Sequence, residues 1–151
     1  MVPKTHVMSK IDVANKLLLN KKFKDAISLY EQILKKEPHN LSALNNNGYA
    51  LSKLKKYTSA IECYNRSLKI EPDDKIVSVN KISIYRKTGR TEDALKLCNK
   101  ILEKSPNELI VLYHKLRLLK KSNKCSESNE ICNKILKKYP SNTDVQNELI
   151  K

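Results

Sequence analysis

The chain has 151 residues, of which 30 are Lys or Arg and 16 are Asp or Glu, and its formal net charge is +14. Its length suits one elongated domain, and no apolar run approaches the ~20 residues that a membrane-spanning helix needs. Met1–Lys10 contains no apolar block of the kind found in secretory signals. We therefore expect a soluble, cytoplasmic protein without a membrane anchor.

A period of 34 residues runs through the chain. Four of its 5 prolines follow one another at that spacing: Pro38, Pro72, Pro106 and Pro140. A period in this range indicates stacked copies of one small unit. The predicted organisation is a lead-in (residues 1–6), four repeats (7–40, 41–74, 75–108 and 109–142) and a partial fifth repeat or capping helix (143–151). Stacked repeats form one continuous domain over residues 7–151 and present an extended surface.

Each copy predicts two antiparallel helices joined by a tight turn. Apolar residues recur three or four positions apart, as at Ala60, Tyr64 and Leu68, which is a helical period. Proline closes the helix before it, and the small polar residues that follow it can cap the next helix. The turns inside the copies are expected at residues 20–22, 55–56, 88–90 and 122–124. Gly89 and Asn123 can take the left-handed conformation that ends a helix, whereas the two lysine-rich turns carry weaker signals.

Residues 143–151 begin a fifth copy in phase but end before a second helix. Val145, Leu149 and Ile150 give this stretch a short apolar face. Two interpretations stay open, namely a short capping helix over the fourth copy or a chain cut from a longer array. The same end can also pair with a second molecule, so we expect a monomer or weak self-association.

The second copy resembles a tetratricopeptide repeat. The family's pattern is matched by Leu44, Asn47-Gly48, Leu51, Tyr57, Ala60, Tyr64 and Pro72. The resemblance covers about residues 7–142. It implies an all-α, right-handed superhelical solenoid of antiparallel helix pairs, with the first helices on the concave face and the second helices on the convex face. It also implies that Gly48 and Ala60 are small so that two helices approach closely, a pattern from which Ile82 and Leu116 depart.

By this resemblance, a partner binds in the concave groove. The first-helix positions that point into the groove hold Asn15, Asn45, Asn46, Tyr49, Asn80, Ser83, Arg86, Tyr113, His114, Arg117 and Lys120. Side-chain amides in the N-terminal half can donate to and accept from a peptide backbone. Arg86, Arg117 and Lys120 make the C-terminal half cationic and should lie near one another. Tyr49 and Tyr113 add flat surfaces of a kind enriched at hot spots. We expect a protein–protein interaction scaffold for an extended, acidic peptide segment.

The family's carboxylate clamp for chaperone tails is not expected in this chain. That clamp needs two asparagines and three cations. Asn15 and Asn46 match the asparagines, but the cation positions hold Ile11, Ile76 and Asn80. A terminal carboxylate would stay unpaired there, so the sequence predicts no chaperone-tail clamp.

Nucleic acid is the alternative partner. A strongly basic protein attracts polyanions. However, 26 of the 30 cations are lysines, and arginine is better suited to bidentate hydrogen bonds with phosphate and base edges. The lysines are spread over every copy, and electrostatic binding needs clustered cations. The alternative function is therefore an RNA- or polyanion-binding repeat protein that uses its lysine-rich surface.

No catalytic, cofactor or metal site is expected. Gly48 and Gly89 are the only glycines, so a phosphate-cradling glycine loop is excluded. The cysteines form no CxxC pair, and only 3 histidines accompany them. Cys98 and Cys132 occupy core positions of their copies, and Cys63 and Cys125 complete the set. Reduced thiols fit a cytosolic protein, and we expect neither enzymatic activity nor a cofactor.

Overall fold

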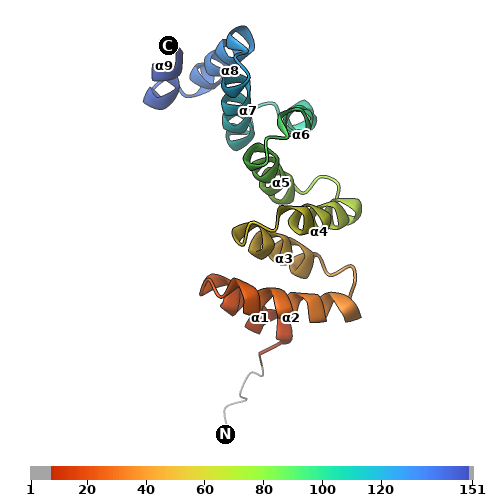
Figure 1. The fold of residues 1–151 in the computed structure, drawn as a ribbon. Coiled ribbons are helices and arrows are strands. Elements are labelled where there is room, and N and C mark those ends of the chain that lie inside the picture. Colours follow the sequence, from red (N-terminus) through yellow and green to blue (C-terminus); the bar gives the residue numbers. More distant parts are fainter. Residues whose placement is uncertain (1–7, 150–151) are drawn as a thin grey trace, which may run out of the picture. The chain divides into compact units, whose positions relative to one another are not determined.

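The structure is a computed structural model, and it describes residues 8–149; the predicted lead-in (1–6) and Ile150 lie outside them. In that range the chain is helical and has no strand. The helices are α1 (Lys10–Leu19), α2 (Phe23–Lys36), α3 (Leu41–Lys53), α4 (Tyr57–Ile70), α5 (Lys75–Lys87), α6 (Thr91–Lys104), α7 (Leu109–Lys121), α8 (Cys125–Lys138) and α9 (Thr143–Leu149) (Figure 1).

The chain forms two compact units, of which the first ends at Val77 and the second begins at Ser78, inside α5. Helices α1 to α4 pack in the first unit, and α6 to α9 in the second. None of the helices in the described part of the chain is long and apolar enough to span a membrane.

The helix bounds repeat with the period of the prolines. Helices α3, α5 and α7 begin at Leu41, Lys75 and Leu109, which are 34 residues apart, and α2, α4, α6 and α8 follow the same step. Each of these last four helices ends two residues before its proline, because proline cannot continue a helix. The predicted helices and turns are confirmed. The division into four repeats with the boundaries given above stays a prediction.

Polar residues after the prolines cap three of the helices. Asn40 Oδ1 accepts the backbone N–H of the residue three positions later, at 2.9 Å, and thereby opens α3. Asp74 Oδ1 does the same for α5 at 3.0 Å, and Asn142 Oδ1 for α9 at 3.2 Å. Glu108 precedes α7 without a side-chain cap. A side-chain cap satisfies one of the backbone N–H groups that lack a partner at a helix start.

The four turns inside the helix pairs share one backbone conformation. Their left-handed residues are Lys21 (φ 59°), Lys55 (φ 60°), Gly89 (φ 74°) and Asn123 (φ 54°). The next residue then donates its N–H to a carbonyl five positions back, as Lys22 does to Leu17 at 2.9 Å. The conformations predicted for Gly89 and Asn123 are confirmed. Those of the two lysines were not predicted, because lysine has no preference for this region.

The core of the first unit depends on small residues. A Cβ atom on Gly48 would lie 2.6 Å from Cε1 of the fully buried Tyr64, so α3 and α4 approach each other closely at this point. Ala60 on α4 is fully buried as well. The close approach that the family resemblance implied at these two positions is therefore present.

The core of the second unit contains two of the cysteines. Cys98 and Cys132 are fully buried, as predicted, and burial raises the pKa of the Cys98 thiol to about 12. Ile82 and Leu116, the two bulky residues at positions where the family has small ones, are also buried. Cys125 is exposed at the first residue of α8.

Candidate functional site

An amide pair joins α1 to α3 in the first unit. Asn15 Oδ1 accepts hydrogen bonds from the Tyr30 hydroxyl at 2.7 Å and from Asn46 Nδ2 at 2.9 Å. Burial raises the pKa of Tyr30 to about 12, so this phenol stays a donor at any physiological pH. The Asn15 carbonyl is thereby saturated. Asn15 Nδ2 and Asn46 Oδ1 make no hydrogen bond within the described residues.

The other two predicted site residues of the first unit lie on α3. Asn45 Nδ2 donates to Asp74 Oδ2 at 3.4 Å, while Asn45 Oδ1 is buried without a partner. Tyr49 is 37% exposed, and Lys53 Nζ lies 4.8 Å from the centroid of its ring. Tyr49 is therefore the most accessible of the four predicted residues in this unit.

Arg86, His114 and Arg117 form a cationic cluster in the second unit, contributed by α5 and α7. His114 is half-buried, and its Nδ1 atom is buried without a hydrogen-bond partner. Burial, and next the positive charges of Arg86 and Arg117, lower the pKa of His114 to about 4. The imidazole is thus neutral near physiological pH. Neither arginine forms an ion pair with a carboxylate of residues 8–149, which leaves two unpaired guanidinium groups near one histidine.

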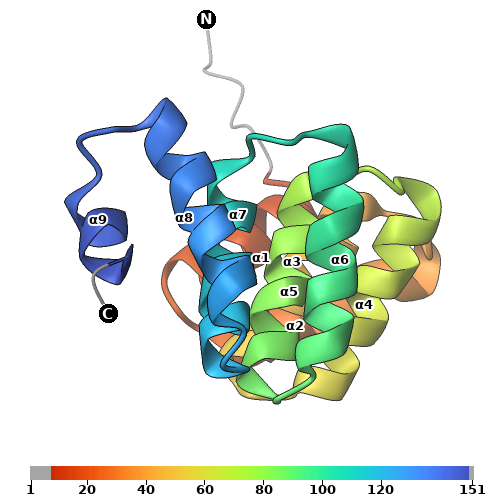
Figure 2. The same ribbon diagram turned by 90° about the horizontal axis from the view of Figure 1, so that it is seen from above.

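Lys120 is engaged by α9. Its Nζ atom donates to the backbone carbonyl of Glu148 at 2.9 Å and also to the Glu148 carboxylate. Tyr113 and Arg117 on α7, together with α9, line a cavity of about 350 Å³. Helix α9 lies against α8 at the C-terminal end of the unit (Figure 1 and Figure 2). The structure therefore places Lys120 against an acidic side chain of its own chain.

Asn80 and Ser83 are the remaining predicted residues, both half-buried on α5. Neither side chain makes a hydrogen bond to another described residue. The predicted set thus includes an amide pair in the first unit and a cationic cluster in the second. Sequence reasoning missed Tyr30, Asn142 and Glu148, which bond to Asn15, Tyr113 and Lys120 respectively. No motif marks these partners, because the contacts join residues 15 to 29 positions apart.

Metal-binding groups are absent from the described part of the chain: no three His, Cys, Asp or Glu side chains gather as a metal ion would need. The second unit therefore offers cations, a neutral histidine and a tyrosine as binding groups.

Comparison with known proteins identifies the repeat. Residues 42–74 match the family model described as tetratricopeptide repeat. A search of curated proteins finds no match to the chain.

Solved structures extend the likeness to nearly the whole chain. A tetratricopeptide repeat protein from Parabacteroides merdae ATCC 43184 is 18% identical with a TM-score of 0.82 over 93% of this chain, which spans only 55% of that protein. MamA from Desulfovibrio magneticus RS-1 is 17% identical with a TM-score of 0.81, over 94% of this chain and 82% of its own. The first TPR domain of Spaghetti (RPAP3), bound to the HSP90 peptide SRMEEVD, is 20% identical with a TM-score of 0.70, over 79% and 98%.

These matches confirm the resemblance that the second copy carries in the sequence. Residues 42–74 are a tetratricopeptide repeat, and the chain has the all-α fold of tetratricopeptide repeat structures.

Proposed function

We propose that the chain is a protein–protein interaction scaffold that binds an extended, acidic segment of a partner protein. The observation that carries the proposal is the cationic cluster of the second unit. Arg86 and Arg117 both lie close enough to His114 to lower its pKa, and neither is paired with a carboxylate of the described residues. A ligand carboxylate placed at this cluster would supply the missing partner.

Electrostatics favours such a ligand. The positive charges of Arg86 and Arg117 repel a third positive charge on the half-buried imidazole of His114. An acidic side chain relieves this repulsion, and arginine can bind a carboxylate through two parallel hydrogen bonds. The neutral imidazole of His114 keeps its Nδ1 atom buried, so the two guanidinium groups supply the contacts to a ligand carboxylate.

The contact between Lys120 and Glu148 supports the same proposal. It is a carboxylate bound to α7, the helix that also carries His114 and Arg117. Taken by itself, the first unit holds Asn15 Nδ2 and Asn46 Oδ1, a donor and an acceptor of the kind that suits a peptide backbone. A relative of the same fold is bound to a peptide, which supports a binding role in general and leaves the acidic partner of this chain as our proposal.

A capture experiment tests the proposal. The chain is used as bait in native lysate at moderate salt, and half of the sample is treated with nuclease. The proposal expects a discrete protein that survives nuclease and is lost with the R86A/R117A variant. The matched control is K96A/K100A, which removes the same charge from exposed positions of α6 and should keep the partner. A partner retained by R86A/R117A, or lost wholly to nuclease, would contradict the proposal.

A further inference from the structure

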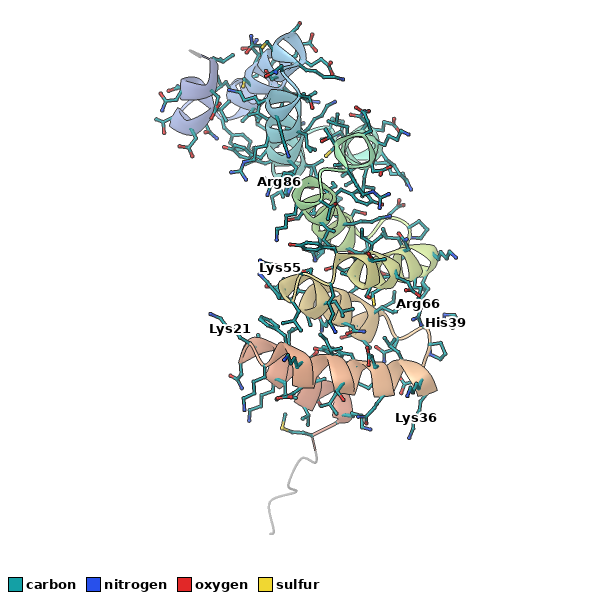
Figure 3. The ribbon with its side chains drawn as sticks, in the orientation of Figure 1. Lys21, Lys36, His39, Lys55, Arg66 and Arg86 are labelled. Atoms are coloured by element: carbon teal, nitrogen blue, oxygen red, sulfur yellow. The ribbon has the colours of Figure 1, made fainter. Side chains whose placement is uncertain are left out.

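Positive charge in the first unit is concentrated along one edge. Helices α1 and α3 contact each other and both end there, so their turns into α2 and α4 lie at the same edge. Figure 3 shows Lys21 and Lys55 at this edge and Lys36 at the opposite edge of the same unit. We call this surface the turn edge. Its exposed lysines are Lys16, Lys21, Lys22, Lys24, Lys53, Lys55 and Lys56.

The turn edge carries the whole charge excess of the first unit. Its seven lysines are accompanied by Asp25 alone, whereas the rest of residues 8–77 holds six cations and seven carboxylates. The opposite edge is close to balance, with five cations and four carboxylates: Lys35, Lys36, Arg66, Lys69 and Lys75 against Glu37, Glu71, Asp73 and Asp74. The lysines of this unit are therefore segregated, which the repeat pattern alone did not predict.

The turn-edge lysines are not neutralised by carboxylates of residues 8–149, although Lys53 lies over the ring of Tyr49. None of the seven forms an ion pair with a carboxylate of the described residues. In the second unit, by contrast, Arg90 pairs with Asp93 at 2.8 Å and Lys124 approaches Glu127 to 3.5 Å, each three residues along the helix. The turn edge is thus a surface of unpaired charge.

Four of these lysines stand where the fold favours other residues. Lys21 and Lys55 are left-handed, a conformation that glycine takes without steric penalty and that Gly89 and Asn123 hold at the equivalent turns. Lys22 and Lys56 occupy the N-cap positions of α2 and α4 without a side-chain cap, as Arg90 and Lys124 also do at α6 and α8. A positive charge at a helix N-terminus is unfavourable. Residues held against local preference are characteristic of functional surfaces.

We propose that the turn edge binds the phosphate backbone of a nucleic acid without reading its bases. Lysine ammonium groups act as point charges toward phosphate and are weak readers of base edges. Exposed lysines spread over two neighbouring turns suit a long, linear polyanion. Each neutralised phosphate releases condensed counterions, so such binding must weaken steeply with salt. This activity is separate from the peptide site proposed above.

The K21G/K55G variant tests the proposal through two measurements that should change in opposite directions, namely thermal stability and RNA affinity. Glycine relieves the left-handed backbone, so the melting temperature should rise by a few degrees. Binding of a labelled single-stranded RNA of about 20 nucleotides should fall by about tenfold at about 0.1 M salt. The slope of log K against log salt should become shallower by about 1.4, for two lost contacts to a single strand. A purely structural role for these lysines would not lower RNA affinity while stability increases.

The matched control is K36Q/K69Q, which removes the same charge from the nearly balanced opposite edge and should change RNA affinity by less than about twofold. The R86A/R117A variant should also keep RNA binding, which separates this inference from the peptide site. Three outcomes would overturn it: unchanged RNA affinity in K21G/K55G, an equal loss in K36Q/K69Q, or binding of the wild type to phosphatidylserine vesicles without binding to RNA.

Discussion

Lys120 of α7 donates hydrogen bonds to both the backbone carbonyl and the carboxylate of Glu148 in α9. The two side chains are 30% and 41% exposed, so water screens the ion pair, which contributes at most about 1 kcal/mol. Helix α9 has seven residues, of which Val145 is buried. The contact is therefore weak enough for an acidic ligand to compete with Glu148 for Lys120.

Replacing Glu148 by Gln should strengthen acidic-ligand binding. The change keeps the shape of the side chain and removes the charge that neutralises Lys120. We expect the affinity for an oligoglutamate peptide, measured by fluorescence anisotropy, to rise about two- to threefold. The control E130Q alters an exposed carboxylate of α8 and should leave the affinity unchanged. Equal affinities for wild type and E148Q would show that α9 does not compete for Lys120.

Replacing Gly48 by Ala should destabilise the first unit. Its new Cβ atom would meet the fully buried ring of Tyr64 at 2.6 Å, so α3 and α4 must separate or the ring must shift. Overpacking of this kind costs about 1–3 kcal/mol, of which better helix propensity returns up to about 1. Urea unfolding of the two proteins checks this. A variant as stable as the wild type would mean that Tyr64 has room to move.

Replacing Gly89 by Ala isolates the backbone contribution. No atom lies within 4 Å of the position that its Cβ would take, but φ is +74°, where an L residue is disfavoured. We expect a loss of about 1 kcal/mol, again from urea unfolding, through conformation alone. An Asn at the same position should lose less than Ala, as the left-handed Asn123 suggests. Equal stability of all three proteins would refute this account of the turn.

His114 should make stability depend on pH. Its pKa is about 4 in the folded chain against an ordinary 6.5, so the unfolded chain binds a proton first as the pH falls. The contribution is complete above about pH 6.5 and disappears toward pH 4, and it amounts to at most about 3 kcal/mol. The H114Q variant should show a flatter decline over this range in thermal unfolding. Parallel curves for the two proteins would exclude His114 as the source.

The peptide SRMEEVD, which is bound in one relative, should bind this chain poorly. Two of the predicted clamp positions hold Ile11 and Ile76, which offer no charge to a terminal carboxylate, and Ile76 is 75% exposed. We expect no micromolar binding in isothermal titration calorimetry. Micromolar affinity would show that other cations of the chain replace the clamp.

Regular spacing made the helices and turns predictable. Proline at a fixed step and apolar residues three or four apart are local signals, and they located every helix pair through Lys138. The burial of Cys98 and Cys132 followed from their place in the copies. The left-handed lysines escaped prediction because their conformation follows from the helix-ending hydrogen bonds rather than from lysine itself.

The candidate site was predictable only as a set of positions. The Asn15 carbonyl accepts a hydrogen bond from Tyr30, which lies 15 residues away in the sequence. Lys120 donates a hydrogen bond to Glu148, which lies 28 residues away. Contacts between separate helices depend on packing and on side-chain conformations, which no short motif records. The segregation of lysines in the first unit likewise required the positions of two turns in space.

The left-handed residue of each turn is exposed in all four turns, and four positions hold three different amino acids. Because none of these side chains enters the core, the backbone accepts a change of residue there with only a local effect on stability. The left-handed position of each turn therefore tolerates substitution. Each copy can carry Lys, Gly or Asn at this position. The net charge of an edge can therefore change in single steps while the sequences of the helices stay the same.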